Sequence, residues 1–485
     1  STFNRNTATS KGGAINGEYI VNIDNSTFVN NTKDINMKNG NIKYTNFTST
    51  SMPVITTTGS VNFIETKING DYPSRNYIIG TFTSDKYGWY VVLNDLVNAA
   101  PAGSTLYLHN RTYVLNQSVT INKNIVIHGG NSSGDNLFST VNGLNTYRLF
   151  YINGAYTVTF ININFINGFV NNANGGAIYA SGGTLTVTNS SFTNNKATST
   201  SGSGHGGAIY GTTVNIVSSN FTSNTAFSSY YTKKYGYGGA VYGYNVVCRD
   251  SNFYNNFASG LGGGIYTPNF VNVTKSTFIN NTSDQPISIT WRGGGGICSE
   301  YKAYVSDSTF INNTATCRAA AISSEYNYVS NSTFYHNIAE SDGGALYAVN
   351  DGIIDHCTFI DNEAHSYGGG AIFVGQYTTK ILSCTFINNT ATIGSGGAIY
   401  FEFRGTLIVE DSVFIGNDAL VDGGAIYTED QSTLSILRTN FTNNTPNAIS
   451  RSTKSTTAST ITDSNFDAPY IPFISNKGGQ ITVTN

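Results

Sequence analysis

Carboxylates are the side chains to test first for chemistry, because enzymes that cleave sugar chains use two of them close together, or a Ca²⁺ ion with a basic residue. The chain has 28 Asp and Glu among its 485 residues. Asp342 and Asp422 each directly precede a Gly-Gly pair, but they lie far apart in the chain. The densest acidic group is interpreted as a solvated face and consists of Glu402, Glu410, Asp411 and Asp418.

Histidine and cysteine show no metal-ligand spacing and no nucleophile signature. The best histidine group, Asp355-His356 with His365, is interpreted as polar surface. The five cysteines are Cys248, Cys298, Cys317, Cys357 and Cys384. Cys357 and Cys384 occupy the same position of two consecutive repeats, so they are expected to stack inside the protein, either as a disulfide or as two thiols. The sequence therefore predicts no catalytic residue, no metal and no cofactor.

Tyrosine and asparagine are the better candidates for contacts with other molecules. The segment "TAFSSYYTKKYGY" at 225–237 contains Tyr230, Tyr231, Tyr235 and Tyr237, which we predict to form an exposed patch that binds a sugar or a protein. Asn-x-Ser/Thr sequons are candidate glycosylation sites if the chain is exported. They include Asn25, Asn110, Asn116, Asn131, Asn189, Asn220, Asn312, Asn331 and Asn388.

Two repeated phrases position these side chains. The first is "GGAIY", at 175–179, 206–210, 396–400 and 423–427, with near copies at 238, 262, 294, 343 and 369. The second is Ser-x-Phe-x-x-Asn, whose Phe residues recur every 24 to 32 positions. These structural Phe residues are Phe192, Phe221, Phe253, Phe278, Phe310, Phe334, Phe359, Phe386, Phe414 and Phe441. A repeat of this length without a helical pattern predicts a β-solenoid.

The apolar positions within one repeat indicate how each coil is built. Residues five and seven places before Phe are usually apolar, as Val187 and Leu185 are, and share one face of a strand. Phe lies an odd number of positions after these residues, so in a straight strand its side chain would point to the opposite face. The chain must therefore bend before Phe for all three side chains to face the core. We predict an all-β parallel β-helix with about 27 residues, three short strands and three turns per coil. The Gly-Gly pair allows positive φ, and stacked Asn side chains can hydrogen-bond to the next coil.

The repeat is interrupted once, which divides the chain into three predicted parts. Residues 1–70 are interpreted as the C-terminal coils of an upstream β-helix. Residues 71–102 are interpreted as an N-terminal cap or connector with a short helix near 90–100, which Pro101 and Gly103 end. Residues 103–485 form the main β-helix. A cap is expected because the first coil of a solenoid exposes backbone groups and apolar side chains.

The last residues of the sequence, followed by its first residues, continue the repeat without a break. The closing "GGQITVTN" and the opening "STFNRN" make a complete repeat, with Ile481 and Val483 seven and five places before Phe3. We expect the chain to be one period of a tandem array, with the main β-helix continuing into residues 1–70 of a following copy. A chance match of phase is the alternative.

The pairing of "GGAI" with "FxxN" resembles polymorphic outer-membrane-protein repeats. The Asn/Thr-rich form, as in "STFINNTA" at 308–315 together with "GGAIY", most resembles the adhesin-like proteins of methanogenic archaea. The resemblance covers about 1–50 and 103–485. It implies a right-handed parallel β-helix on the outside of an archaeal cell, as a glycoprotein that acts in cell adhesion.

The expected function is an extracellular structural and adhesive protein, one period of a tandem-repeat cell-surface stalk or filament, and not an enzyme. Its expected partners are further copies of itself, end to end, and glycans or surfaces of other cells. The alternative is a single adhesin module that binds a glycan or host protein through its loop edge, and a polysaccharide lyase or hydrolase is a third hypothesis. A net charge of −3 gives no argument for nucleic acid, and no apolar run could span a bilayer.

Overall fold

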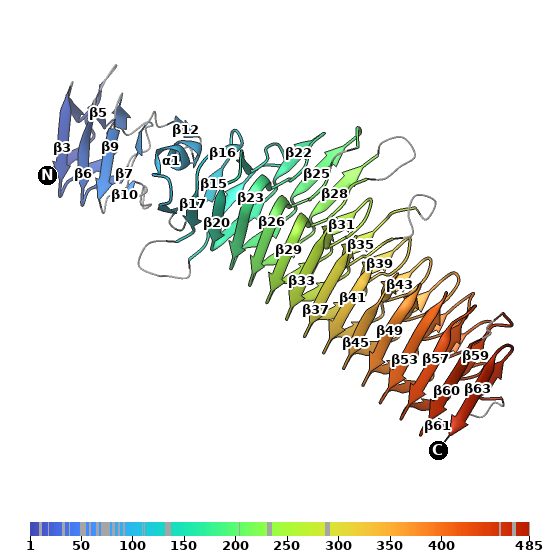
Figure 1. Cartoon of the computed structure of the whole chain (residues 1–485). Coiled ribbons are helices and arrows are strands. Elements are labelled where there is room, and N and C mark those ends of the chain that lie inside the picture. Colours follow the sequence, from blue (N-terminus) through green and yellow to red (C-terminus); the bar gives the residue numbers. More distant parts are fainter. Residues whose placement is uncertain are drawn as a thin grey trace.

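The computed structural model shows a right-handed parallel β-helix with one short helix (Figure 1). The predicted fold class is therefore confirmed. The structure describes residues 1–485 except 9–11, 18, 32–33, 38, 49–54, 58–59, 65–66, 69–77, 80–82, 86–87, 91–92, 109, 111, 131–136, 203, 230–234, 287–291, 455–456, 468–471 and 485.

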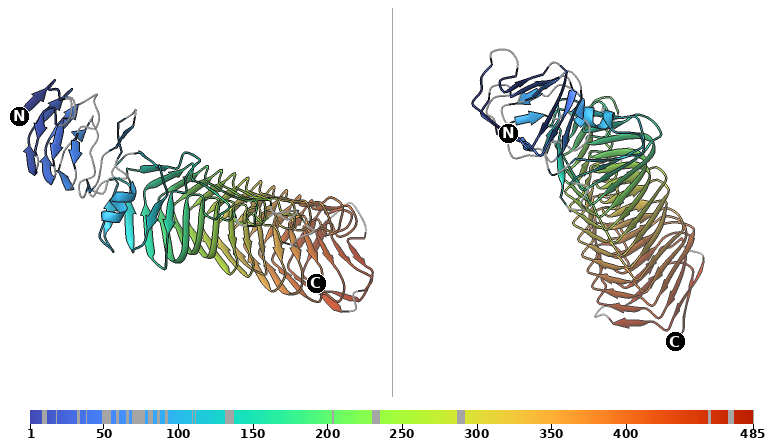
Figure 2. Two further views of the ribbon diagram at one scale, coloured as in Figure 1. Left: turned by 90° about the horizontal axis from the view of Figure 1, so that it is seen from above. Right: turned by 90° about the vertical axis from the view of Figure 1, so that its left-hand side faces the viewer.

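Three parallel sheets run along the main stack of coils (Figure 2). Most coils contribute two consecutive strands to a 26-stranded sheet and one strand to a 14-stranded sheet, and ten coils add one strand to a 10-stranded sheet. One typical coil consists of β36 (Ile297–Ser299), β37 (Lys302–Ser306), β38 (Thr309–Ile311) and β39 (Thr314–Ala315). Such coils have one strand more than the three predicted, because the first residues after the Asn turn pair with the next coil before the variable loop begins.

The 14-stranded sheet carries the repeated Phe residues. Its strands are β15 (Thr112–Val114), β18 (Ser139–Asn142), β21 (Ile163–Ile166), β24 (Ser191–Thr193), β27 (Asn220–Thr222), β30 (Asn252–Tyr254), β34 (Thr277–Ile279), β38, β42 (Thr333–Tyr335), β46 (Thr358–Ile360), β50 (Thr385–Ile387), β54 (Val413–Ile415), β58 (Asn440–Thr442) and β61 (Asn465–Asp467). From Phe165 to Phe466 the rings stack with centroids 4.4 to 5.1 Å apart. The ten Phe residues found in the sequence are all buried in this stack.

A buried asparagine ladder runs beside the Phe stack. Its ten members, each three residues after a Phe, are Asn195, Asn224, Asn256, Asn281, Asn313, Asn337, Asn362, Asn389, Asn417 and Asn444. In a typical member, Asn313 Nδ2 donates to Asn337 Oδ1 and to Phe278 O, both at 3.0 Å. Asn313 Oδ1 in turn accepts the backbone N–H and the Nδ2 of Asn281, again at 3.0 Å. Each side-chain amide is thus paired within a closed interior, where an unpaired polar group would be costly.

A second ladder stands two residues before each Phe. There a hydroxyl, such as Ser276 Oγ, donates to the carbonyl two residues earlier and accepts the backbone N–H of the previous coil's Ser251 at 3.2 Å. Cys357 and Cys384 replace the hydroxyl in two consecutive coils, and the backbone N–H of Cys357 donates to Cys384 Sγ at 3.5 Å. All five cysteines are buried, and none forms a disulfide. Cys357 and Cys384 were predicted to form either a disulfide or two thiols, and in the structure they are two thiols.

The first glycine of each GGAIY-type phrase has positive φ, as at Gly294 with φ 75°. The second lies against the next coil, and a Cβ at Gly207 would lie 2.1 Å from Gly239 O. Close stacking therefore favours glycine there, although Ala320 takes this position in one coil. Two later coils depart from the pattern. Pro446 and Asn447 replace the pair in one of them, and in the other Ala319 takes the first position with φ 56°. An alanine in this region carries local backbone strain.

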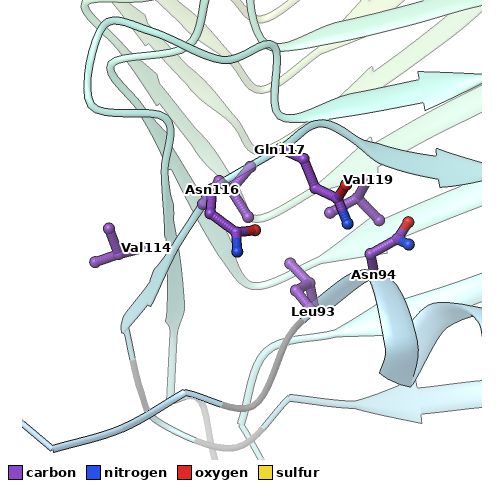
Figure 3. A pocket seen from close by; sticks show the side chains of 7 residues that line it. Leu93, Asn94, Val114, Asn116, Gln117 and Val119 are labelled. Carbon is purple, nitrogen blue, oxygen red and sulfur yellow. The ribbon is translucent and has the colours of Figure 1, made fainter. Parts of the chain in front are cut away.

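Helix α1 (Leu93–Ala99) covers the first coil of the main stack, within the segment predicted to be helical. Leu93, Leu96 and Val97 are buried in the same core as the coils. Asn94 Oδ1 accepts the backbone N–H of Thr120 at 3.1 Å. Figure 3 shows Leu93 and Asn94 facing the coil across a cavity of about 10 Å³, which is too small for more than one water. The helix therefore closes the apolar end of the solenoid.

Residues before the helix form a shorter stack with the same pattern. Its strands are β1 (Thr2–Asn4), β4 (Thr27–Val29), β7 (Asn46–Thr48) and β10 (Lys67–Ile68) in one sheet, β3 (Ile20–Asp24), β6 (Asn39–Lys43), β9 (Ser60–Ile64) and β11 (Ile78–Ile79) in a second, and β2 (Ile15–Asn16), β5 (Ile35–Met37) and β8 (Ile55–Thr57) in a third. A separate hairpin pairs β12 (Thr83–Asp85) with β13 (Gly88–Tyr90). Phe3, Phe28 and Phe47 stack at 4.7 and 4.6 Å. The Asn6–Asn31 pair repeats the ladder contact at 2.9 Å.

Replacing one ladder amide tests how much the asparagine ladder stabilises the stack. The substitution Asn313→Ala removes four hydrogen bonds and leaves the buried amide of Asn281 and the carbonyl of Phe278 short of partners. We expect a loss of about 2 to 4 kcal/mol in the free energy of unfolding, measured by urea denaturation. Hydrogen exchange at the Asn281 backbone amide should also become faster.

The neighbouring Asn312→Gly is the matched control. Asn312 is exposed with φ 52°, a conformation that glycine adopts readily, so we expect a change within about 0.5 kcal/mol. Equal effects of the two substitutions would contradict a stabilising role for the ladder.

Candidate functional site

A shallow groove of about 300 Å³ lies on the outer face of the 26-stranded sheet. It crosses four consecutive coils, over strands β33 (Phe270–Thr274), β37, β41 (Tyr326–Ser330) and β45 (Gly352–Asp355). The side chains that define it are Asn272, Tyr304, Ser306, Tyr328, Ser330, Ile353 and Asp355. This surface, which we term the Tyr304–Tyr328 groove, was not singled out from the sequence.

Strand alternation explains why these residues face solvent. In β37, Ala303 and Val305 point into the core, so Tyr304 and Ser306 point outward. Tyr304 pairs in register with Tyr328, and their rings stack with centroids 5.1 Å apart and planes 11° apart. Tyr304 remains 40% exposed. The signal in the sequence is an aromatic residue six places before Phe in two consecutive repeats.

The groove carries little charge. Among its lining residues only Asp355 has a carboxylate, and His356 Nδ1 lies 2.7 Å from Asp355 Oδ1. Lys302 lies to one side, with Nζ 4.8 Å from the centroid of Tyr301 and 5.7 Å from that of Tyr326. The lining therefore offers hydroxyl groups, an amide, a carboxylate and aromatic ring edges.

The tyrosine patch predicted at 225–237 is placed only in part. Tyr230 and Tyr231 lie outside the described residues. Tyr235 and Tyr237 are half-buried, and the Tyr237 ring packs 4.8 Å from Tyr266 and 5.1 Å from His205. Burial raises the pKa of Tyr237. Tyr237 therefore packs over the aromatic residues that close the Gly-Gly phrases.

The two aspartates that precede Gly-Gly pairs are held in ion pairs. Arg318 Nε lies 2.7 Å from Asp342 Oδ2, and both side chains are almost fully buried. The Arg318 guanidinium also lies 4.9 Å from the centroid of Tyr347, to whose hydroxyl it donates at 2.9 Å. Asp422 pairs with Lys477 and accepts a hydrogen bond from Asn447. These contacts hold loops of neighbouring coils together.

The remaining acidic and histidine candidates differ in their surroundings. Arg438 donates to both oxygens of Asp411, at 2.6 and 2.8 Å. His365 lies between Glu340 and Glu363, at 3.2 and 2.8 Å. Burial is the largest single influence and lowers the pKa of His365, but the hydrogen bonds and charges of the two carboxylates together raise it above its ordinary value. Among the described residues, no group of three or more His, Cys, Asp or Glu could hold a metal ion.

Glu402 has a neighbour that the sequence did not indicate. Glu402 and Glu429 follow the equivalent strands β52 (Ile399–Phe401) and β56 (Ile426–Thr428), and the Glu429 N–H donates to Phe401 O at 2.9 Å. Burial raises the pKa of Glu402, and Glu429 acts in the same direction while Arg318 opposes it. Adjacent carboxylates are one element that the hydrolase hypothesis needs, so the absence of enzymatic activity stays a prediction.

Most of the predicted glycosylation sites are accessible. Asn189 is half-buried and donates to Asn162 Oδ1 at 2.8 Å, and Asn131 lies outside the described residues. The others are exposed, namely Asn25, Asn110, Asn116, Asn220, Asn312, Asn331 and Asn388. Glycosylation at these positions stays a prediction.

Comparison with known families gives two matches. Residues 287–424 match the model of the right-handed β-helix region, and residues 1–18, 189–212 and 250–268 match the Chlamydia polymorphic membrane protein repeat. A search of curated proteins found no match. The chain is thus similar to repeat proteins of the polymorphic membrane type, as predicted, whereas the likeness to archaeal adhesins stays a prediction. Within the described part of the chain, no helix has the length and hydropathy needed to cross a bilayer.

His205 is buried, and we expect its protonation to destabilise the protein in acid. Burial lowers the pKa of His205 to about 4, and its Nδ1 accepts the backbone N–H of Tyr237 at 3.2 Å. The unfolded chain binds a proton near pH 6.5, so it takes up protons before the folded chain does. We therefore expect the contribution of His205 to the free energy of unfolding to be full above about pH 6.5. This contribution decreases as the pH falls toward about 4, by at most on the order of 3 kcal/mol.

Urea denaturation between about pH 7 and pH 4.5 measures this effect. We expect His205→Gln to flatten the pH dependence relative to the wild type. His356→Gln, at an exposed histidine, is the control and should leave the slope unchanged. A wild-type slope in the His205→Gln variant would contradict the assignment.

Proposed function

We propose that the chain is a segment of an extracellular β-helical stalk or filament on a cell surface and that it acts in attachment. The observation that supports this most is the continuous stack of Phe rings and Asn amides, which runs through ten successive coils without a break. Such a stack produces a stiff rod, since each coil is held by both neighbours. The match to polymorphic membrane protein repeats supports a surface location.

The outermost coils of the two stacks share three equivalent strand positions of the repeat. At one end these are β61, β62 (Ile474–Asn476) and β63 (Gln480–Thr484), and at the other β1, β2 and β3. β63 pairs with β60 (Ala458–Thr462), and β3 pairs with β6. Among the described residues each of these strands pairs on one side, and the edge of a sheet favours addition of a further strand.

The partner that best fits these edges is a second copy of the chain. Phe3 would stack on Phe466, and Ile481 and Val483 would pack against the next coil at Val21 and Ile23. Val483 is 55% exposed, so stacking would remove apolar surface from water. In this arrangement residues 1–70 complete the β-helix formed by residues 103–485 of another copy, with 71–102 as the connector.

Sedimentation of the purified chain tests this stacking. We expect association that increases with concentration and gives elongated species, because the same edges are present on every copy. Val483→Asp should weaken it by placing a charge between coils. Val421→Asp is the matched control, since Val421 is 57% exposed on the side of the rod. A chain that stays monomeric at about 100 μM, or a Val483→Asp variant that associates like the wild type, would contradict end-to-end stacking.

A further inference from the structure

We propose that the Tyr304–Tyr328 groove binds a neutral glycan chain. The inference rests on the proposed attachment function, because it names the class of molecule to which the rod would attach. It places the contact on a flat wall of the β-helix, away from the loop edge that contains Tyr235 and Tyr237.

The backbone beneath the groove cannot recruit a peptide strand. β33, β37, β41 and β45 each pair in register with the coil on either side, so their backbone groups are already hydrogen-bonded. Addition of a peptide strand requires a free sheet edge. A ligand must therefore be recognised by the outward side chains alone.

Those side chains match a polyhydroxylated ligand. Tyr304 and Tyr328 contribute hydroxyl groups and ring edges, and the next outward row contributes the hydroxyls of Ser306 and Ser330. Asn272 adds an amide that can donate and accept. Hydroxyl groups of sugars also donate and accept, so they can pair with each of these groups.

The charge of the lining excludes a polyanion. No Lys or Arg lines the groove, and Asp355 would repel sulfate, phosphate or uronate groups. Nucleic acids and acidic glycans depend on cationic contacts, whereas Lys302 and Lys380 stand on the same wall but outside the lining. A neutral chain avoids this repulsion and keeps the Asp355 carboxylate as a hydrogen-bond acceptor.

The groove is confined to a few coils, and it is rigid. The outward column six places before Phe holds Thr186 and Asn215 in earlier coils and Lys380 and Ser435 in later ones, so the tyrosine pair marks one place on the rod. Four coils span on the order of 14 Å, enough for a short run of sugar units along the rod. Ring stacking holds both tyrosines in place, which reduces the entropy lost on binding.

Titration of the full chain with a panel of neutral, sulfated and uronate-containing oligosaccharides tests the proposal. We expect at least one neutral oligosaccharide to bind with a dissociation constant below about 1 mM. The double substitution Tyr304→Ala with Tyr328→Ala should weaken that binding about tenfold or more. Tyr304→Phe with Tyr328→Phe should produce a smaller loss of glycan affinity, because this variant keeps the aromatic rings and removes only the hydroxyl groups.

Tyr335→Ala is the matched control. Tyr335 is 42% exposed and lies in the coil of Tyr328 but on the Phe wall, so its removal should leave glycan binding unchanged. Circular dichroism confirms that each variant folds. The proposal fails if no neutral oligosaccharide binds at about 1 mM, if only anionic ones bind, or if the double alanine variant binds like the wild type. Any of these results with end-to-end stacking retained would overturn the glycan site and leave the proposed rod intact.

Discussion

The side-chain amide of the buried asparagine is the interaction on which the rest of the structure depends. Each amide must find its partners in the coils before and after it, because no water reaches the interior to replace them. Pairing Asn313 with both Asn281 and Asn337 fixes the register of three coils at once. A slip of one residue would turn Phe310 outward and leave the amides unpaired.

This constraint determines where the chain can vary. The repeat ranges from 24 to 32 residues, yet the Phe rings and Asn amides remain stacked. Extra residues are accommodated between the 10-stranded sheet and the next Gly-Gly pair, where no ladder passes. Outward positions on the walls are also free to change, since they take no part in the ladders. The Tyr304–Tyr328 groove uses this freedom on a support that the interior holds rigid.

The ladders could be predicted from the sequence because each stacks identical residues at identical places in the repeat. The Phe stack, the Asn ladder and the Gly-Gly turns follow from types and spacing alone. Contacts between unlike residues of different coils could not be predicted in this way. Arg318 meets Asp342 across two coils at positions that the repeat does not relate. Glu402 and Glu429 do occupy equivalent positions of consecutive coils, but this pair stands outside the repeated phrases and was not predicted. The groove was not predicted because exposed tyrosines were expected in the loops, whereas Tyr304 and Tyr328 lie on a strand face.

Electron microscopy of the native material tests the central claim most directly, that the protein works as a rod extended by stacking of its coils. The account predicts continuous filaments with a strand spacing of about 4.8 Å along the axis and density that passes from the coil of Phe466 into the coil of Phe3 of the next copy. Separate short rods with free ends, at every concentration examined, would contradict it.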